Sequence, residues 1–199
     1  RLTTGMMGKV LSWSNTGIIM GKNSKWTKET IISDKIEGLS TIKLDPFYDF
    51  RGEIWTVYDK EYTDYNFVAD KITVSGYGVL RGFHGDSNTA KLITCLSGHV
   101  QLAVLDLREG SETYGNAETF FLTDHTPKIV IVPAGCVNAH LCLSDKCIFY
   151  YKWSEQYKGP DEQVTIAWDD SDIDVNWTIK HPILSERDKN GVKFQGVTL

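Results

Sequence analysis

The stretch KLITCLSGHVQLAVLDL, residues 91–107, decides the fold class of this 199-residue chain. Two apolar runs stand on either side of Ser97 and Gly98, a pair of residues that is typical of turns. Similar runs recur along the chain, about eleven in all, and many begin roughly 8–12 residues apart. The others are TIKLDPFYDF, GEIWTVYD, NFVADKITV, GVLRGFHG, ETFFLT, KIVIVPAG, AHLCLS, CIFYYKW and VTIAW. This spacing predicts an all-β fold, an antiparallel jelly roll or β-barrel.

The length predicts a single domain, because 199 residues can bury one core and are too few to assume two. Residues 9–37 show no clear periodicity, so we expect an N-terminal arm or peripheral segment over residues 1–37. Residues 38–199 are then expected to form the one folded domain, ending in a short C-terminal tail. No amphipathic helical window precedes that tail.

The composition argues against several kinds of partner. The formal net charge is -5, and Lys and Arg are scattered among Asp and Glu, so nucleic acid is not expected to bind. The sequence has no run of about 18 apolar residues and no signal peptide, which indicates a cytoplasmic protein without a membrane partner. Cys95, Cys136, Cys142 and Cys147 lack C-x-x-C spacing, and we expect them to be reduced, buried thiols.

The stretch GYGVLRGFHGD, residues 76–86, is the first candidate site. A single strand histidine is more often structural than catalytic, but the neighbours of His84 favour a site. Gly82 and Gly85 would let a ligand approach the backbone, and Arg81 offers a planar fork for phosphate or carboxylate. Arg81 and His84 are three residues apart, so a regular strand would aim them at opposite faces. A bulge at Gly82 would bring both to one side.

A metal centre is the main rival interpretation of a histidine in a small β-barrel. Such a centre needs three or four converging His, Cys or carboxylate ligands. In VPAGCVNAH the position where a later histidine ligand would fall is Asn138. His99, His125 and His181 lie near turns or ends, with no partner at ligand spacing. The sequence therefore predicts no metal site.

Two strands add further candidate groups. In CIFYYKW, alternation places Cys147, Phe149, Tyr151 and Trp153 on one face. Taken singly, Tyr151 would be an amphipathic core residue, and Lys91 in AKLITCL would be an exposed lysine at a strand end. Together with His84, they make up a base, a cation and a phenol. Proton transfer next to a carbonyl requires such a set, since one group removes the proton, one stabilises the enolate and one returns a proton.

Several segments, taken in order, resemble the dTDP-4-dehydrorhamnose 3,5-epimerases, which are cupin enzymes of nucleotide-sugar biosynthesis. The segments are Arg51-Gly52, GVLRGFH, KLITCLSGHVQLAVLDLREGSETYG, IVPAGCVNAHLCLS, YYKWSEQY, IAWDD and ILSERD, over about residues 40–190. The resemblance implies a homodimeric cupin isomerase that needs no cofactor. It would invert carbon 3 or carbon 5, or both, beside the ketone of a nucleotide-linked 4-keto-6-deoxy sugar. The chain also lacks the G-x-G-x-x-G stretch typical of dinucleotide sites.

The resemblance also implies roles for the proton-transfer groups. His84 resembles the base, and Asp188 of LSERD resembles the carboxylate that orients it. Lys91 resembles the lysine that stabilises the enolate oxygen. Tyr151 resembles the acid that protonates the opposite face of the sugar.

A second set of residues is expected to bind the nucleotide-diphosphate sugar. Arg51 and Arg81 are similar to the family's diphosphate-binding arginines. By the same resemblance, Asn138, Tyr157 and Glu162 are expected to complete the substrate site.

Four positions depart from the family pattern: Thr56, Asp86, Asn138 and Gln156 stand where glutamate, glutamine, histidine and tyrosine are usual. These departures fall on expected binding positions and leave the proton-transfer set intact. We therefore expect an active epimerase whose substrate differs in base, sugar length or the carbon inverted. Two alternatives stay open, a nucleotide-sugar 3,4-ketoisomerase and a non-catalytic sugar-binding cupin.

Overall fold

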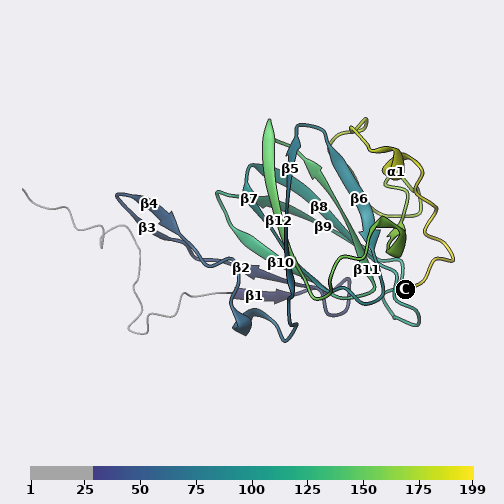
Figure 1. The fold of residues 1–199 in the computed structure, drawn as a ribbon, viewed down its shortest axis with the longest axis horizontal. Helices are drawn as coiled ribbons and strands as arrows, with labels where there is room; N and C mark the ends of the chain where they lie inside the picture. Colours follow the sequence, from purple (N-terminus) through teal and green to yellow (C-terminus); the bar gives the residue numbers. More distant parts are fainter. Residues whose placement is uncertain (1–28) are drawn as a thin grey trace, which may run out of the picture.

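The computed structural model describes residues 29–199, which form two facing β-sheets and a separate hairpin (Figure 1). From edge to edge, the larger sheet contains β1 (Glu29–Ile32), β2 (Ser40–Lys43), β10 (Lys128–Val132), β7 (Lys91–Ser97), β12 (Lys146–Trp153) and β5 (Ala69–Gly76). The smaller sheet contains β13 (Val164–Thr165), β6 (Leu80–Gly85), β11 (Cys136–Cys142), β8 (His99–Asp106) and β9 (Ala117–Thr123). The strand pairs of both sheets are antiparallel. This architecture confirms the predicted all-β jelly-roll barrel.

The remaining elements are short. The hairpin consists of β3 (Phe47–Asp49) and β4 (Gly52–Ile54), and it projects away from the barrel (Figure 1). Within residues 29–199, two 3-10 turns, η2 (Lys60–Tyr62) and η3 (Pro160–Glu162), interrupt the connections between strands. A single helical turn, α1 (Glu186–Lys189), lies in the C-terminal segment.

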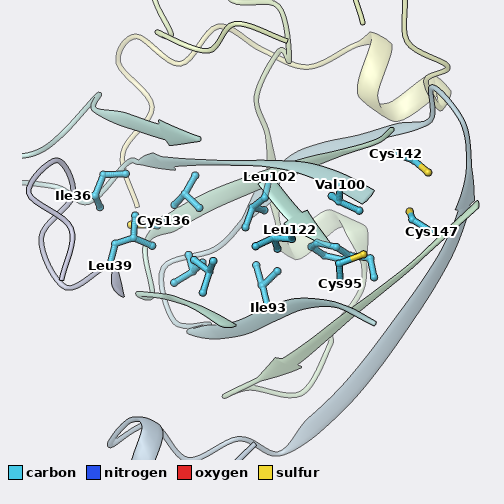
Figure 2. Packing of buried hydrophobic residues seen from close by; sticks show 14 residues of the cluster. Ile36, Leu39, Ile93, Cys95, Val100, Leu102, Leu122, Cys136, Cys142 and Cys147 are labelled. Carbon is cyan, nitrogen blue, oxygen red and sulfur yellow. The ribbon is translucent and has the colours of Figure 1, made fainter. Parts of the chain in front are cut away.

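The main core fills the space between the two sheets. Ile93 from the larger sheet shares one buried cluster with Leu102 and Leu122 from the smaller sheet (Figure 2). Phe149 from the larger sheet belongs to the same cluster. Strand alternation explains this core, because every second side chain of each strand points to the inner face. In CIFYYKW the predicted alternation is confirmed, since Cys147, Phe149 and Trp153 are buried.

The outer face of the smaller sheet is covered by the C-terminal segment. Ile173, Trp177 and Phe194 pack there, against a cluster that includes Leu105. As a result β8 is buried at every position after His99, and its sequence is mostly apolar on both faces, with Gln101 and Asp106 as the buried polar exceptions. The predicted short C-terminal tail is therefore a covering segment of the fold.

The predicted N-terminal arm, residues 1–37, lies mostly outside the described residues. Its last part belongs to the barrel: β1 pairs with β2, and Ile36 is fully buried in the main core. The domain in the structure thus begins earlier than residue 38. The sequence ETII of β1 is too short, and too exposed, to have been distinguished by periodicity.

The cysteines are free and buried, as predicted. Burial raises the pKa of the Cys95 and Cys136 thiols to about 12, so both stay protonated at neutral pH. No helix within residues 29–199 is long and apolar enough to cross a membrane. The cytoplasmic location stays a prediction.

The bulge predicted at Gly82 is present in β6. Arg81 pairs with His140, and His84 pairs with Asn138. The two pairs are three residues apart on β6 but only two apart on β11, so β6 contains one extra residue between them. The φ of Gly82 is +117°, a value that side chains with a Cβ rarely adopt. A Cβ added there would lie 2.5 Å from the carbonyl oxygen of Asn138. Glycine is therefore required for β6 to approach β11 at this point.

We predict that Gly82→Ala lowers the free energy of unfolding by about 1–3 kcal/mol, because it adds both backbone strain and a backbone clash. Chemical denaturation measures the change. Gly76→Ala is the matched control, since its Cβ would meet nothing nearer than the Asp145 carbonyl oxygen at 3.7 Å. Equal stability of the two variants would contradict the assigned role of Gly82.

Candidate active site

A pocket of about 200 Å³ lies between the two sheets. Strands β5, β7 and β12 form one wall, and β6, β11 and the segment at α1 form the other. Seven of the nine site residues predicted from the sequence line it: Arg81, His84, Lys91, Asn138, Tyr151, Tyr157 and Asp188. The fold thus brings together groups that are up to about 100 residues apart in the chain.

His84 and Asp188 are in direct contact within one wall of the pocket. His84 Nε2 lies 2.7 Å from Asp188 Oδ1, with the carboxylate off the line of the ring N–H. Ser185, the N-cap residue of α1, donates its hydroxyl to Asp188 Oδ2 at 2.7 Å. Burial opposes ionisation of Asp188, but the contacts with His84 and Ser185 prevail and hold its pKa below the ordinary value. An ionised carboxylate here holds the imidazole in place and stabilises it when it takes up a proton.

Lys91 reaches from β7 to the opposite wall. Its Nζ donates to Asn138 Oδ1 at 2.7 Å and to the His84 carbonyl oxygen at 3.0 Å, and the residue is 3% exposed. Burial lowers the pKa of Lys91 to about 8, although the carboxylate of Asp86 opposes that shift. An ammonium has three N–H donors, so one remains for a ligand.

Tyr151 lies on β12, in the wall that faces His84 and Asp188. Its ring packs between those of Phe149 and Trp153, with centroids 5.4 and 5.8 Å away. Burial raises the pKa of Tyr151, against the opposing influence of Arg81. The phenol therefore stays protonated at neutral pH and can donate a proton.

Arg81 on β6 and His140 on β11 also line the pocket. Arg81 Nε donates to Ser75 Oγ at 3.0 Å, which anchors the guanidinium and leaves its outer fork for a ligand. His140 stacks on Phe149 with centroids 3.8 Å apart. Burial lowers the pKa of His140 to about 3, so this second histidine is neutral. It can donate or accept a hydrogen bond, but it adds no charge to the pocket.

Two predicted site residues are not in the pocket. Arg51 stands at the tip of the β3–β4 hairpin, beside Asp49, with 74% of its side chain exposed. Glu162 lies in η3 and lines a neighbouring cavity of about 140 Å³. Trp153 and Tyr157 line both the pocket and this cavity.

The pocket also contains residues that the sequence did not single out. They are Lys71, Thr73, His140, Phe149, Trp153, Gln163, Ser185 and Arg187. Alternation in CIFYYKW does place Phe149 and Trp153 on the face of Tyr151, and alternation in β5 would have placed Lys71 beside Thr73. Ser185 and Arg187 lie within ILSERD, the segment from which Asp188 was assigned, whereas nothing in the sequence pattern distinguishes Gln163.

The four positions that depart from the family pattern are not equivalent. Asn138 lines the pocket, and its side-chain oxygen is engaged by Lys91. Asp86 and Gln156 line the neighbouring cavity, and Thr56 lines neither. The Asp86 carboxylate accepts the backbone N–H groups of Asn88 and Thr89, which ties it into a turn.

The arrangement defines a class of protein: a jelly-roll barrel whose pocket holds groups that can accept and donate protons. A histidine paired with a carboxylate faces a protonated phenol, and a buried ammonium shares the pocket. Within residues 29–199, no group of three His, Cys, Asp or Glu side chains is placed to hold a metal ion.

Residues 33–196 match the sequence profile described as dTDP-4-dehydrorhamnose 3,5-epimerase, and the chain belongs to this family. A dTDP-4-dehydrorhamnose 3,5-epimerase from Methanothermobacter thermautotrophicus is 32% identical to this chain, over 80% of the chain and 91% of the relative. The resemblance seen in the sequence is thereby confirmed.

Solved structures of epimerases are also similar to this chain. The crystal structure of dTDP-4-dehydrorhamnose 3,5-epimerase from Elizabethkingia anophelis NUHP1 has a TM-score of 0.76 at 33% identity, covering 84% of this chain and 97% of that one. A dTDP-6-deoxy-D-glucose-3,5-epimerase from Legionella pneumophila Philadelphia 1, in complex with dTDP-4-keto-L-rhamnose, has a TM-score of 0.80 at 26% identity, covering 85% and 94%. These neighbours support the cupin fold predicted from the sequence.

We predict that kcat/KM falls as the pH rises through about 8, because Lys91 then loses the proton with which it would stabilise an enolate. The pH dependence of kcat/KM measures this alkaline limb. Lys91→Arg places an always-charged guanidinium at the same position, so its remaining activity should lack the limb. An unchanged limb in Lys91→Arg would assign it to another group.

Proposed function

We propose that this protein is a cofactor-independent isomerase that epimerises carbon 3, carbon 5 or both of a nucleotide-linked 4-keto-6-deoxy sugar. Such a reaction belongs to deoxysugar biosynthesis of the rhamnose type. The observation that carries the proposal is the position of His84 and Tyr151 on facing walls of one pocket, with Lys91 buried beside them. Family membership and the dTDP-sugar bound to the Legionella relative support the substrate class.

Inversion of a carbon next to the ketone is a sequence of proton transfers. His84 Nε2 faces Asp188, which leaves Nδ1 to take the proton from that carbon. The C–H electron pair becomes the carbon–carbon double bond of an enolate, and the negative charge moves to the oxygen on carbon 4. The Lys91 ammonium stabilises that oxygen, and Tyr151 then gives its hydroxyl proton to the opposite face. Exchange with water returns the imidazolium and the phenolate to their starting forms.

The test is incubation with a dTDP- or GDP-linked 4-keto-6-deoxy sugar in heavy water, followed by mass spectrometry. Wild-type protein should incorporate one deuterium for each carbon that it epimerises. His84→Asn should abolish incorporation, because no base remains to take the proton. Tyr151→Phe should still exchange hydrogen while inversion falls by a factor on the order of 10², since only the returning proton is lost.

Other outcomes separate the competing functions. A product with its carbonyl at carbon 3 would identify a 3,4-ketoisomerase. Binding of the nucleotide sugar without any deuterium incorporation would identify a non-catalytic binding protein. Full exchange in His84→Asn would reject His84 as the base.

We further propose a homodimer in which the β3–β4 hairpin reaches the pocket of a second copy. The hairpin extends from the barrel (Figure 1), and its apolar side chains are solvent-exposed, 90% for Phe50 and 64% for Ile54. Apolar groups so exposed are typical of a protein interface. Arg51 lies between them and is remote from the pocket of its own chain, so a second copy would allow it to bind diphosphate.

Subunit complementation tests this arrangement. We predict that Arg51→Met and His84→Asn are each impaired, and that coexpressing the two chains restores activity. In a mixed dimer, the pocket with an intact His84 receives Arg51 from the other chain. No recovery in mixed dimers, or a monomer by light scattering at micromolar concentration, would contradict the proposal.

A further inference from the structure

Lys71 is a pocket cation that the proposed proton transfers do not use. Its Nζ lies 4.1 Å from the ring centroid of Trp153 and 3.6 Å from that of Tyr157. Burial lowers its pKa. Among residues 29–199, no carboxylate lies within ion-pair distance of it. Aromatic faces attract the ammonium without using its N–H donors, which are left for a ligand.

Lys71 and Arg81 stand at opposite ends of the pocket. Lys71, Thr73 and Ser75 share the inner face of β5, and Ser75 anchors Arg81. Lys71 and Ser75 are four residues apart, which is about 13 Å along a strand. The Lys71 ammonium leans towards Trp153, the direction away from Ser75. A diphosphate bound by Arg81 beside Ser75 would lie on the side away from the Lys71 ammonium, which leaves Lys71 for another part of the ligand.

The position of Lys91 indicates which part of the ligand Lys71 would contact. Lys91 is paired in register with Trp153, and its Nζ lies 5.5 Å from the Trp153 ring centroid. Both ammonium groups therefore flank this indole. If Lys91 meets the oxygen on carbon 4 and Arg81 meets the diphosphate, the end at Lys71 receives the side of the sugar remote from the diphosphate.

Trp153 has a free donor at this same end. The residue is 5% exposed, and its Nε1 is buried with no hydrogen-bond partner within the described residues. A buried N–H left without an acceptor is costly, so a ligand oxygen would stabilise it. The neighbouring cavity, which shares Trp153, Tyr157 and Gln163 with the pocket, adds about 140 Å³ of space there.

We infer that Lys71 and Trp153 determine specificity by binding an oxygen-bearing substituent on carbon 5 of the sugar, which extends into the neighbouring cavity. This inference rests on the proposed function and names its substrate class. A hydroxyalkyl chain fits, because its oxygen accepts from the ammonium and the indole while its CH₂ groups contact the aromatic rings. A methyl group would leave both donors unpaired, and sites built to bind an oxygen discriminate strongly against analogues that lack it.

The test compares two 4-keto sugars on the same nucleotide, a 6-deoxyhexose with a methyl group on carbon 5 and a 6-deoxyheptose with a hydroxyethyl group there. Wild-type kcat/KM should favour the longer chain by about tenfold or more, mainly through KM. Lys71→Met and Trp153→Phe should each bring the two substrates to within about threefold while still exchanging deuterium on the methyl sugar. Lys71→Arg, which keeps the charge, and Lys146→Met, at the exposed far end of β12, should keep the preference.

Three results would overturn the inference: a wild-type preference for the methyl sugar, no preference, or equal losses on both sugars in Lys71→Met. If wild-type protein exchanges deuterium on neither sugar, the proposed function fails separately. Calorimetric binding of the two nucleotide sugars then decides the inference. Tighter binding of the heptose that Lys71→Met abolishes supports it, and equal affinities reject it.

Discussion

The site depends on one buried charge, the Lys91 ammonium between the two sheets. Removing an ammonium from water is unfavourable, and here two neutral oxygens and no carboxylate surround it among the described residues. The fall of its pKa to about 8 means that the pocket destabilises the charged form by roughly 3 kcal/mol relative to water, although the ammonium still predominates at neutral pH. The same two contacts join β7 to β6 and β11, so they fix how closely the walls approach beside His84.

A two-sheet barrel suits stereochemical inversion for a geometric reason. Inversion needs a proton acceptor and a proton donor on opposite faces of one ring, and the inner faces of two packed sheets oppose each other. His84 and Tyr151 occupy such opposing faces. Each is held by neighbours of a different kind, the Asp188 carboxylate at 2.7 Å for His84 and two aromatic rings for Tyr151.

Sequence patterns predicted the parts of the site that lie on regular strands. Alternation placed Tyr151 on the inner face, and the three-residue spacing of Arg81 and His84 required the bulge found at Gly82. Alternation gives the face of a side chain but not its depth, so it could not show that Lys71 and Trp153 line a pocket. The position of Arg51 on a projecting hairpin depends on tertiary structure, which no local pattern encodes.

Sequence periodicity also could not predict that the C-terminal segment covers the outer face of the smaller sheet. Ile173, Trp177 and Phe194 are isolated apolar residues in irregular chain. Their burial can be predicted only once the sheet face that they cover is known. Gln101 illustrates the dependence, because this fully buried amide binds the backbone of Asn176 and Thr178. A polar residue within an apolar strand was the one local sign that another segment must pack there.

The place of Asp188 in the chain separates two events in time. A ribosome releases a chain from its N-terminus, and Asp188 follows β13, the last strand of the barrel. Every strand has therefore been synthesised before the carboxylate that faces His84. A nascent chain can pair its strands and bury its main core while its histidine still lacks that partner.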